Sequence, residues 1–222
     1  MRNRATQLPA ASRRPARSRE TTRKAILDAA AREFAKAGLA GARTDAIAME
    51  ARVNKAMLYY YFKSKQRLYE AVVEEFFAEF NRQALKVLAG HGPAQEVLLR
   101  YVNLHFDFIC NHRKHAALYQ QLMMTGGKPL ERLVKRHFVP RSEAFSALLV
   151  RGMRDGEFRK AEVRHTALSI VALIVFYFSA APVLELLGQK DVFSPADLAA
   201  RKRAVLEFIR HGLFMDGKAK SK

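Results

Sequence analysis

The sequence has few of the residues that stabilise small secreted proteins. Its 222 residues include no tryptophan and a single cysteine, Cys110, which excludes a disulfide within the chain and fits a reducing compartment. Acidic residues are also scarce, at 21 against 39 Lys and Arg, so the formal charge is +18. A charge of this size favours a polyanionic partner such as nucleic acid.

Motifs that would indicate an enzyme, a metal site or a secreted protein are also missing. There is no Gly-rich phosphate-binding loop and no serine-centred elbow, so we expect neither catalysis nor a cofactor. His112 and His115 could share a helix face, but zinc needs more ligands in a fixed geometry. Residues 1–19 contain six arginines and no apolar h-region, which argues against a signal peptide. They predict a flexible basic arm that either lies along DNA or is solvated.

The most informative stretch runs from Thr44 to Lys65 and has the pattern of two short helices joined by a tight turn. Thr44 is a candidate N-cap for the first helix, and Asn54 is one for the second. In the second helix, Leu58 and Phe62 are four residues apart and are expected to face inward. The other positions are available to contact DNA: Lys55, Ala56, Met57, Tyr59, Tyr60 and Tyr61.

This pattern is typical of a helix-turn-helix that binds DNA. The first residues of the second helix, Lys55 to Met57, can reach base edges when the helix enters the major groove. Tyrosine hydroxyls can donate to phosphate oxygens, and Lys65 begins a third helix, where the helix dipole also favours a phosphate. The alternative is an ordinary helical hairpin. However, three consecutive tyrosines span about 200° of a helix, and one core cannot bury them all.

The stretch also resembles the TetR/AcrR family of bacterial repressors over roughly residues 21–75. The family pattern is represented here, in order and spacing, by Gly38, Ile47-Ala48, Val53, Leu58-Tyr59-Tyr60-Tyr61-Phe62 and Ser64-Lys65. The resemblance implies that DNA is contacted by Thr44, Lys55, Ala56, Met57, Tyr59, Tyr60, Tyr61 and Lys65.

One position departs from the family pattern. The family usually has glycine in the turn, and this chain has Arg52. A non-glycine residue with positive φ costs about 1 kcal/mol. Either the turn is built differently here, or Arg52 contributes something such as an extra phosphate contact. A solvated turn residue is the simpler interpretation.

The remaining sequence predicts helices, with no convincing strand pattern and no internal repeat. We expect helices at Glu20 to Gly38, Lys65 to about Leu88, and about 94–110, 113–125, 129–154, 162–187 and 195–214. Pro140 should kink or split the helix at 129–154. The predicted fold is all-α, with a basic arm (1–19), a three-helix helix-turn-helix DNA-binding domain (20–66), a larger helical ligand-binding and dimerisation domain (67–215) and a basic tail (216–222).

The 19 residues from Thr166 to Leu184 carry no formal charge, which is near the length of a membrane span. Pro182 and several small or polar residues dilute the hydrophobicity, and a helix that is apolar on all sides can also be buried by protein. One chain of this size cannot surround it, so we expect a homodimer and no membrane. The resemblance implies that 162–187 and 195–214 form the two-fold interface. From the uncharged stretch itself we expect Leu173, Phe176, Tyr177 or their neighbours near the axis.

In the resembling family the inner helices enclose an effector cavity. The residues that we expect to line it are Phe106, Ile109, Leu122, Met123, Phe138, Phe145, Ile174 and Phe178. Because the body is rich in Phe and Met, an apolar or aromatic small molecule is expected. The predicted function is a cytoplasmic, homodimeric transcriptional repressor that binds a pseudo-palindromic DNA operator and is released by this effector. The alternative is a helical protein-interaction module without a DNA target.

Overall fold

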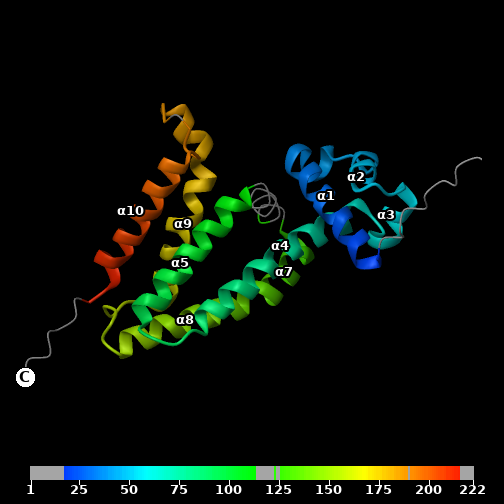
Figure 1. Ribbon diagram of the computed structural model, residues 1–222. Helices are drawn as coiled ribbons and strands as arrows, with labels where there is room; N and C mark the ends of the chain where they lie inside the picture. Colours follow the sequence, from blue (N-terminus) through cyan, green and yellow to red (C-terminus); the bar gives the residue numbers. More distant parts are fainter. Residues whose placement is uncertain (1–17, 114–122, 124–125, 190, 216–222) are drawn as a thin grey trace, which may run out of the picture.

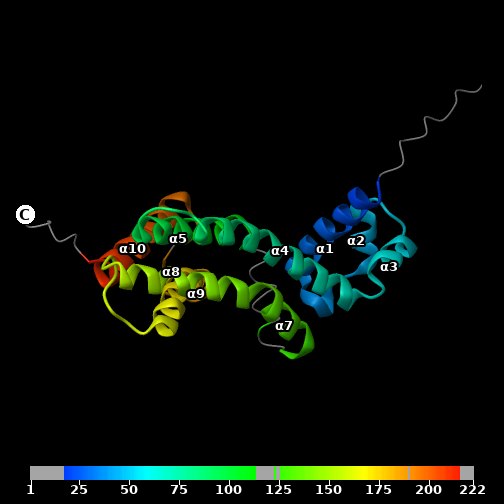
Figure 2. The same cartoon turned by 90° about the horizontal axis from the view of Figure 1, so that it is seen from below.

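The computed structural model describes residues 18–113, 123, 126–189 and 191–215, and these residues form helices and no strand. The helices are α1 (Arg19–Gly41), α2 (Thr44–Ala51), α3 (Lys55–Phe62), α4 (Lys65–Leu88), α5 (Ala94–Asn111), α7 (Gly127–Leu133), the π-helix η1 (Val134–Phe138), α8 (Val139–Arg154), α9 (Val163–Leu186) and α10 (Pro195–Leu213). Figures 1 and 2 show α1–α3 as a small head at one end of α4, while the later helices form a larger body. The all-α prediction is confirmed.

Apolar side chains from all three helices hold the head together. Ile26, Ala30 and Phe34 lie on one face of α1 at helical spacing, and all three are fully buried. They belong to the same hydrophobic cluster as Ile47 of α2 and Leu58 of α3, which are also fully buried. Burying a side chain of this size stabilises a fold by about 2 kcal/mol, so these contacts fix the position of the two short helices.

Side-chain caps set where the next helices begin. The Asn54 side chain accepts a hydrogen bond from the N–H three residues later at 2.7 Å, as predicted, and Ser64 does the same at 3.1 Å. The prediction that Thr44 caps α2 is wrong. Arg43 occupies the N-cap position without a side-chain cap, and its backbone N–H donates instead to Glu33 Oε1 at 2.9 Å. A carboxylate from α1 therefore takes the place of a local cap.

Helix α4 carries the chain from the head into the body. Leu68, Val72, Phe76 and Phe80 are buried along it in steps of four residues. At the head end the Tyr69 ring meets the ring of Phe34 edge-on, at 5.2 Å between centroids. Further along, the same helix packs against α5 and α8 of the body. One continuous helix thus contributes to both cores.

The segment predicted at 129–154 is split, as Pro140 suggested. Helix α7 gives way to the π-helical turn Val134–Phe138, and Pro140 lies in the first turn of α8. Proline cannot donate a backbone hydrogen bond and its ring crowds the preceding turn. The wider π-helical turn accommodates the missing hydrogen bond and the crowding by the ring, and the helical segment continues through it. The helix predicted at 113–125 falls almost entirely outside the described residues.

The turn after α8 contacts α8 itself, the end of α10 and the start of α5. Phe158 is buried against Gly152 and stacks on Phe214, which follows α10. The Glu157 carboxylate accepts from the N–H groups of Ala94 and Gln95, both at 2.9 Å, and so satisfies the free start of α5. These contacts give the turn a structural role in the body.

Replacing Gly152 by alanine should therefore destabilise the body. A Cβ atom at this position would lie 2.2 Å from the Phe158 ring, which is buried and has no free space to move into. Overpacking of this kind costs about 1–3 kcal/mol, so the midpoint of thermal unfolding should fall by several degrees. Gly212→Ala is the matched control, because a Cβ there meets no atom within 4 Å. Equal melting temperatures for the two variants would contradict the close contact.

Candidate nucleic-acid interface

Two backbone positions with positive φ shape the helix-turn-helix. Gly38 (φ 64°, ψ -179°) has non-helical backbone angles, so the regular first helix ends there as predicted, and a short helical stretch follows the kink to Gly41. Arg52 ends α2 in the left-handed conformation (φ 57°, ψ 46°), and its N–H donates to carbonyls in the last turn of α2. The turn is therefore built in the conformation that glycine favours, with arginine held in it. The Arg52 side chain is exposed.

The start of α3 faces solvent. Lys55, Ala56 and Met57 are all exposed, and Met57 keeps 40% of its surface. On the opposite side of the helix Leu58 and Phe62 are buried, as predicted. The exposed end of this short helix therefore carries a basic residue (Lys55), a small residue (Ala56) and a flexible apolar residue (Met57). This end is narrow enough to enter a major groove.

The three consecutive tyrosines divide as the geometry of a helix requires. Tyr59 and Tyr60 are 38% and 55% exposed, whereas Tyr61 is partly buried against the head core. Tyr60 is flanked by positive charge: its hydroxyl accepts from Arg19 Nη2 at 2.7 Å, and Lys63 lies over its ring at 5.5 Å. Arg19 begins α1 directly after residues 1–17, which lie outside the described residues. Arg19, the last residue of the predicted basic arm, therefore lies beside α3.

The basic residue at the start of α3, Lys55, forms an ion pair with an acidic side chain of α2. Lys55 Nζ lies 2.9 Å from Asp45 Oδ1, and both side chains are at least half exposed. Their hydrogen bond lowers the pKa of Asp45 and raises the pKa of Lys55, so both groups are charged at neutral pH. A DNA contact by Lys55 would have to compete with this pair.

Thr44 and Lys65 lie on either side of the junction between α1 and α2. Thr44 is the first residue of α2 and is partly buried. Lys65 Nζ donates to the backbone carbonyls of Ala40 and Ala42, at 3.0 and 3.1 Å. An ammonium group has three donors, so Lys65 holds the end of α1 with two of them and keeps one for another acceptor.

The residues predicted to line an effector cavity are only partly brought together. Phe106, Ile109, Phe145 and Ile174 are buried in the body, and Phe138 and Phe178 are partly buried. Phe106 packs on Phe178 with 5.2 Å between ring centroids. Met123 is 50% exposed, which does not suit a lining residue, and Leu122 lies outside the described residues.

The sequence analysis missed a group of buried polar residues in the same body. Asn81 of α4, His105 of α5, and His137 and Arg141 of the η1–α8 segment are each less than 10% exposed. Arg141 Nη1 donates to Asn81 Oδ1 at 2.8 Å, and Asn81 Nδ2 donates to the His137 carbonyl at 2.7 Å. Helical spacing held the missing signal, because Arg141 lies four residues before Phe145 and shares its inner face.

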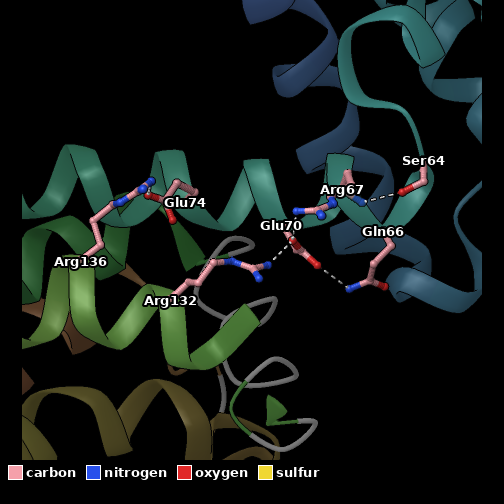
Figure 3. A network of polar contacts seen from close by, with 7 residues as sticks. All are labelled: Ser64, Gln66, Arg67, Glu70, Glu74, Arg132 and Arg136. Carbon is pink, nitrogen blue, oxygen red and sulfur yellow. Dashed lines mark hydrogen bonds and ion pairs between the residues drawn. The ribbon is translucent and has the colours of Figure 1, made fainter. Parts of the chain in front are cut away.

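This buried group continues into a row of ion pairs along α4 (Figure 3). Glu74 accepts from Arg136 at 2.7 Å and contacts His137 Nε2 at 2.8 Å, while Glu70 accepts from Arg132 at 2.8 Å. Partial burial acts to raise the pKa of Glu74. The hydrogen bonds from Arg136 and His137 outweigh it, and the pKa lies below its ordinary value. We call these contacts of Glu70 and Glu74 with Arg132, Arg136 and His137 the α4 clasp.

At the head end of the clasp, Glu70 reaches the first turn of α4. Its carboxylate accepts from Gln66 Nε2 at 3.4 Å and lies 3.6 Å from Arg67 Nη1. The Arg67 backbone N–H in turn donates to Ser64, the cap at which α4 begins beside α3 (Figure 3). The body segment α7–η1 is thereby connected, through side chains of α4, to the helix end that supports the head.

Comparison with known proteins agrees with this arrangement. Residues 26–72 match the family described as bacterial regulatory proteins of the tetR family, and residues 95–209 match the tetracyclin repressor-like C-terminal domain. The chain belongs to the TetR family. The first match covers the helix-turn-helix and the start of α4, and the second covers most of the body.

Relatives of this TetR-family chain have similar lengths. The transcriptional repressor NicS of Pseudomonas putida is 30% identical over 174 residues, which cover 74% of this chain and 79% of NicS. The transcriptional regulator RutR of Escherichia coli K12 is 26% identical over 192 residues, covering 85% and 90%. A protein from Saccharomonospora viridis, described as a transcriptional regulator and crystallised with choline, has the same fold. Its TM-score is 0.73 at 20% identity, with 89% of this chain and 100% of that chain covered.

The chain is accordingly a DNA-binding transcriptional regulator of the TetR family, and its helix-turn-helix is the element that the family match identifies. Its relatives are transcriptional regulators and not enzymes. In the part of the chain that the structure describes, no group of three or more His, Cys, Asp or Glu is placed to hold a metal.

The Lys55–Asp45 pair predicts that Asp45→Asn will strengthen DNA binding. The substitution frees Lys55 and removes a negative charge near the phosphates, so the dissociation constant at low salt should fall by about threefold. Fluorescence anisotropy with DNA from upstream of the protein's own gene measures it. In a Lys55→Met background, Asp45→Asn should give a smaller gain. An equal gain in both backgrounds would show that release of Lys55 is not the cause.

Proposed function

We propose that this TetR-family regulator is a homodimeric repressor that binds a pseudo-palindromic operator and is released by a small effector bound in the body. The observation that carries the proposal is an uncovered apolar surface on α9. Leu168, Phe176 and Val183 are 64%, 68% and 57% exposed and lie along one stripe of this helix. On the neighbouring α10, Phe208 is 67% exposed.

Among the residues that the structure describes, α9 is also the one helix whose length and composition would allow it to span a membrane. Its most apolar window has a mean hydropathy of 2.3, and 17% of that window is buried. A second copy of the chain is the occupant that we favour, because a two-fold axis would place the same stripe of each subunit against the other. Obligate interfaces of this kind commonly bury about 2,000 Å² or more, for which two long helices per subunit suffice.

Of the three residues expected near the axis, Phe176 fits best. Tyr177 donates its hydroxyl to the Val192 carbonyl, and Arg201 lies 5.5 Å over its ring. Leu173 is partly buried, and its carbonyl accepts from Arg201 at 2.7 Å. The Tyr177 side chain is thus engaged within the subunit and Leu173 packs partly against its core, which leaves Phe176 to meet the partner.

Two heads brought together in this way would face two half-sites of one operator. We propose that each contacts bases through Lys55, Ala56 and Met57, and phosphates through Thr44, Tyr59, Tyr60, Tyr61 and Lys65. The supporting observations are the exposed end of α3 and the positive groups beside Tyr60. We also propose that the basic arm adds phosphate contacts, because Arg19 already touches Tyr60 at the edge of this surface.

Release from DNA requires an effector that prefers one arrangement of the heads over another. The α4 clasp is the route that we propose between effector and head, since it ties the α7–η1 segment to the first turns of α4. An apolar or aromatic effector fits the many rings of the body. The predicted location in the cytoplasm follows from the proposed function on DNA.

Phe176→Asp tests the dimer and its link to DNA binding together. The aspartate would be desolvated twice in a two-fold interface, so sedimentation should show monomers at micromolar concentration. Operator affinity should fall by about tenfold or more, because one head holds half of the contacts. Val150→Asp, on an exposed position of α8, should change neither property. A wild-type protein that sediments as a monomer without detergent would overturn the proposal.

A further inference from the structure

Three helices of the body bring polar side chains together in its interior. Asn81 of α4, His105 of α5 and Arg141 of α8 are 6%, 7% and 9% exposed. They are surrounded by aromatic rings, since His105 lies 4.5 Å from the Phe80 ring and 5.7 Å from the Tyr101 ring, measured between centroids. Burying polar groups among rings is unfavourable unless each group finds a partner. We therefore expect this buried polar cluster to have a function.

His105 is the member whose hydrogen bonding is incomplete. Its Nδ1 atom is fully buried and has no hydrogen-bond partner among the described residues. Buried nitrogen atoms are rarely left in this state, and each one calls for an explanation. Burial and the charge of Arg141 lower the pKa of His105 to about 3, so its ring is neutral at physiological pH. A neutral imidazole can offer one N–H to an acceptor.

Arg141 supplies a positive charge that acts on His105. Its guanidinium donates to Asn81 Oδ1 at 2.8 Å and lies 4.9 Å over the Phe80 ring and 4.7 Å over the Phe138 ring. The planar guanidinium has five N–H donors and matches the geometry of a carboxylate. An arginine fork and a buried histidine nitrogen that share the Phe80 ring as a neighbour have the chemistry of an anion site.

We propose that the effector of this regulator is an organic anion whose carboxylate binds Arg141 and His105 and whose apolar part packs on the surrounding rings. The inference rests on the proposed function, because it names the chemical class of the effector for the body site. A ligand with a positive head group would meet the like charge of Arg141. The ring pairs Tyr101–Phe145 and Phe80–Phe108, at 4.6 and 5.0 Å between centroids, suit an aromatic or short aliphatic acid.

A surface groove is separated from the cluster by two aromatic rings. It has a volume of about 560 Å³, lies between α1 and α4, and is lined on its inner side by Phe76, Phe108 and His112. Phe108 packs on Phe80, which packs on His105. These ring contacts make Phe80 and Phe108 the residues that separate the groove from the polar cluster.

The same residues connect the proposed site to the α4 clasp. Arg141 donates to Asn81, Asn81 donates to the His137 carbonyl, and His137 contacts Glu74. A carboxylate that draws the Arg141 guanidinium away from Asn81 would disturb this chain of hydrogen bonds at its inner end. The anion would thereby change the contacts of α4, which supports the head.

Matched pairs of acids and amides test the proposal on the full-length dimer. The pairs are benzoate and benzamide, phenylacetate and phenylacetamide, and hexanoate and hexanamide, which differ in charge and scarcely in shape. Calorimetry should show that at least one acid binds roughly tenfold or more tightly than its amide. Arg141→Met and His105→Phe should each weaken that acid by a similar factor. Arg100→Met, on an exposed position of α5 paired with Glu96, should not.

Equal binding of acids and amides, or binding of none of the acids, would overturn the proposal, as would an Arg141→Met protein that is folded and keeps full affinity. If Arg141→Met does not fold, the wild-type comparison and His105→Phe still decide. Operator binding without any additive is measured in parallel. Its loss would refute the repressor function alone, whereas operator binding with no response to acids would refute the anion site alone.

Discussion

Helix α4 belongs to both the head and the body, so neither core can be repositioned without moving side chains of the other. Its buried stripe runs from Leu68, near the head, to Phe80, deep in the body. A continuous helix is stiff over this length because each backbone hydrogen bond depends on its neighbours. Reorientation of the head must therefore involve α4 as a whole, and contacts along its exposed side decide which orientation is preferred.

The α4 clasp provides such contacts. Ion pairs with a solvent-exposed partner, such as those of Arg132 and Arg136, contribute little to stability one at a time, typically about 0–1 kcal/mol. The row formed by Glu70 and Glu74 with three basic residues of α7–η1 is thus better suited to setting an orientation than to holding the fold together. The π-helical turn supplies part of this row, and π-helical turns are frequent at functional positions. Weak contacts that all act on one helix can be shifted by an effector without unfolding the body.

The sequence was sufficient to predict the helices and the DNA-binding element, because burial follows helical spacing and the caps at Asn54 and Ser64 are local. The prediction failed where the hydrogen-bond partner of a residue comes from another helix. The start of α2 uses Glu33 from α1 where Thr44 was expected, and Lys65 is held by carbonyls of Ala40 and Ala42. The proposed effector site was incompletely predicted for the same reason. Asn81, His105 and Arg141 come from three helices, and only their packing brings them together.

The central claim is that the α4 clasp sets the angle of the head relative to the body. Spin labels at Met49→Cys in α2 and Val150→Cys in α8, both exposed positions, would report it after Cys110 is replaced by serine. The distance distribution within a subunit, measured in dimers that carry one labelled chain, should be narrow with the clasp intact. It should shift or broaden in Glu70→Gln/Glu74→Gln, while Glu96→Gln on α5 should leave it unchanged. An identical distribution with and without the clasp would contradict the account.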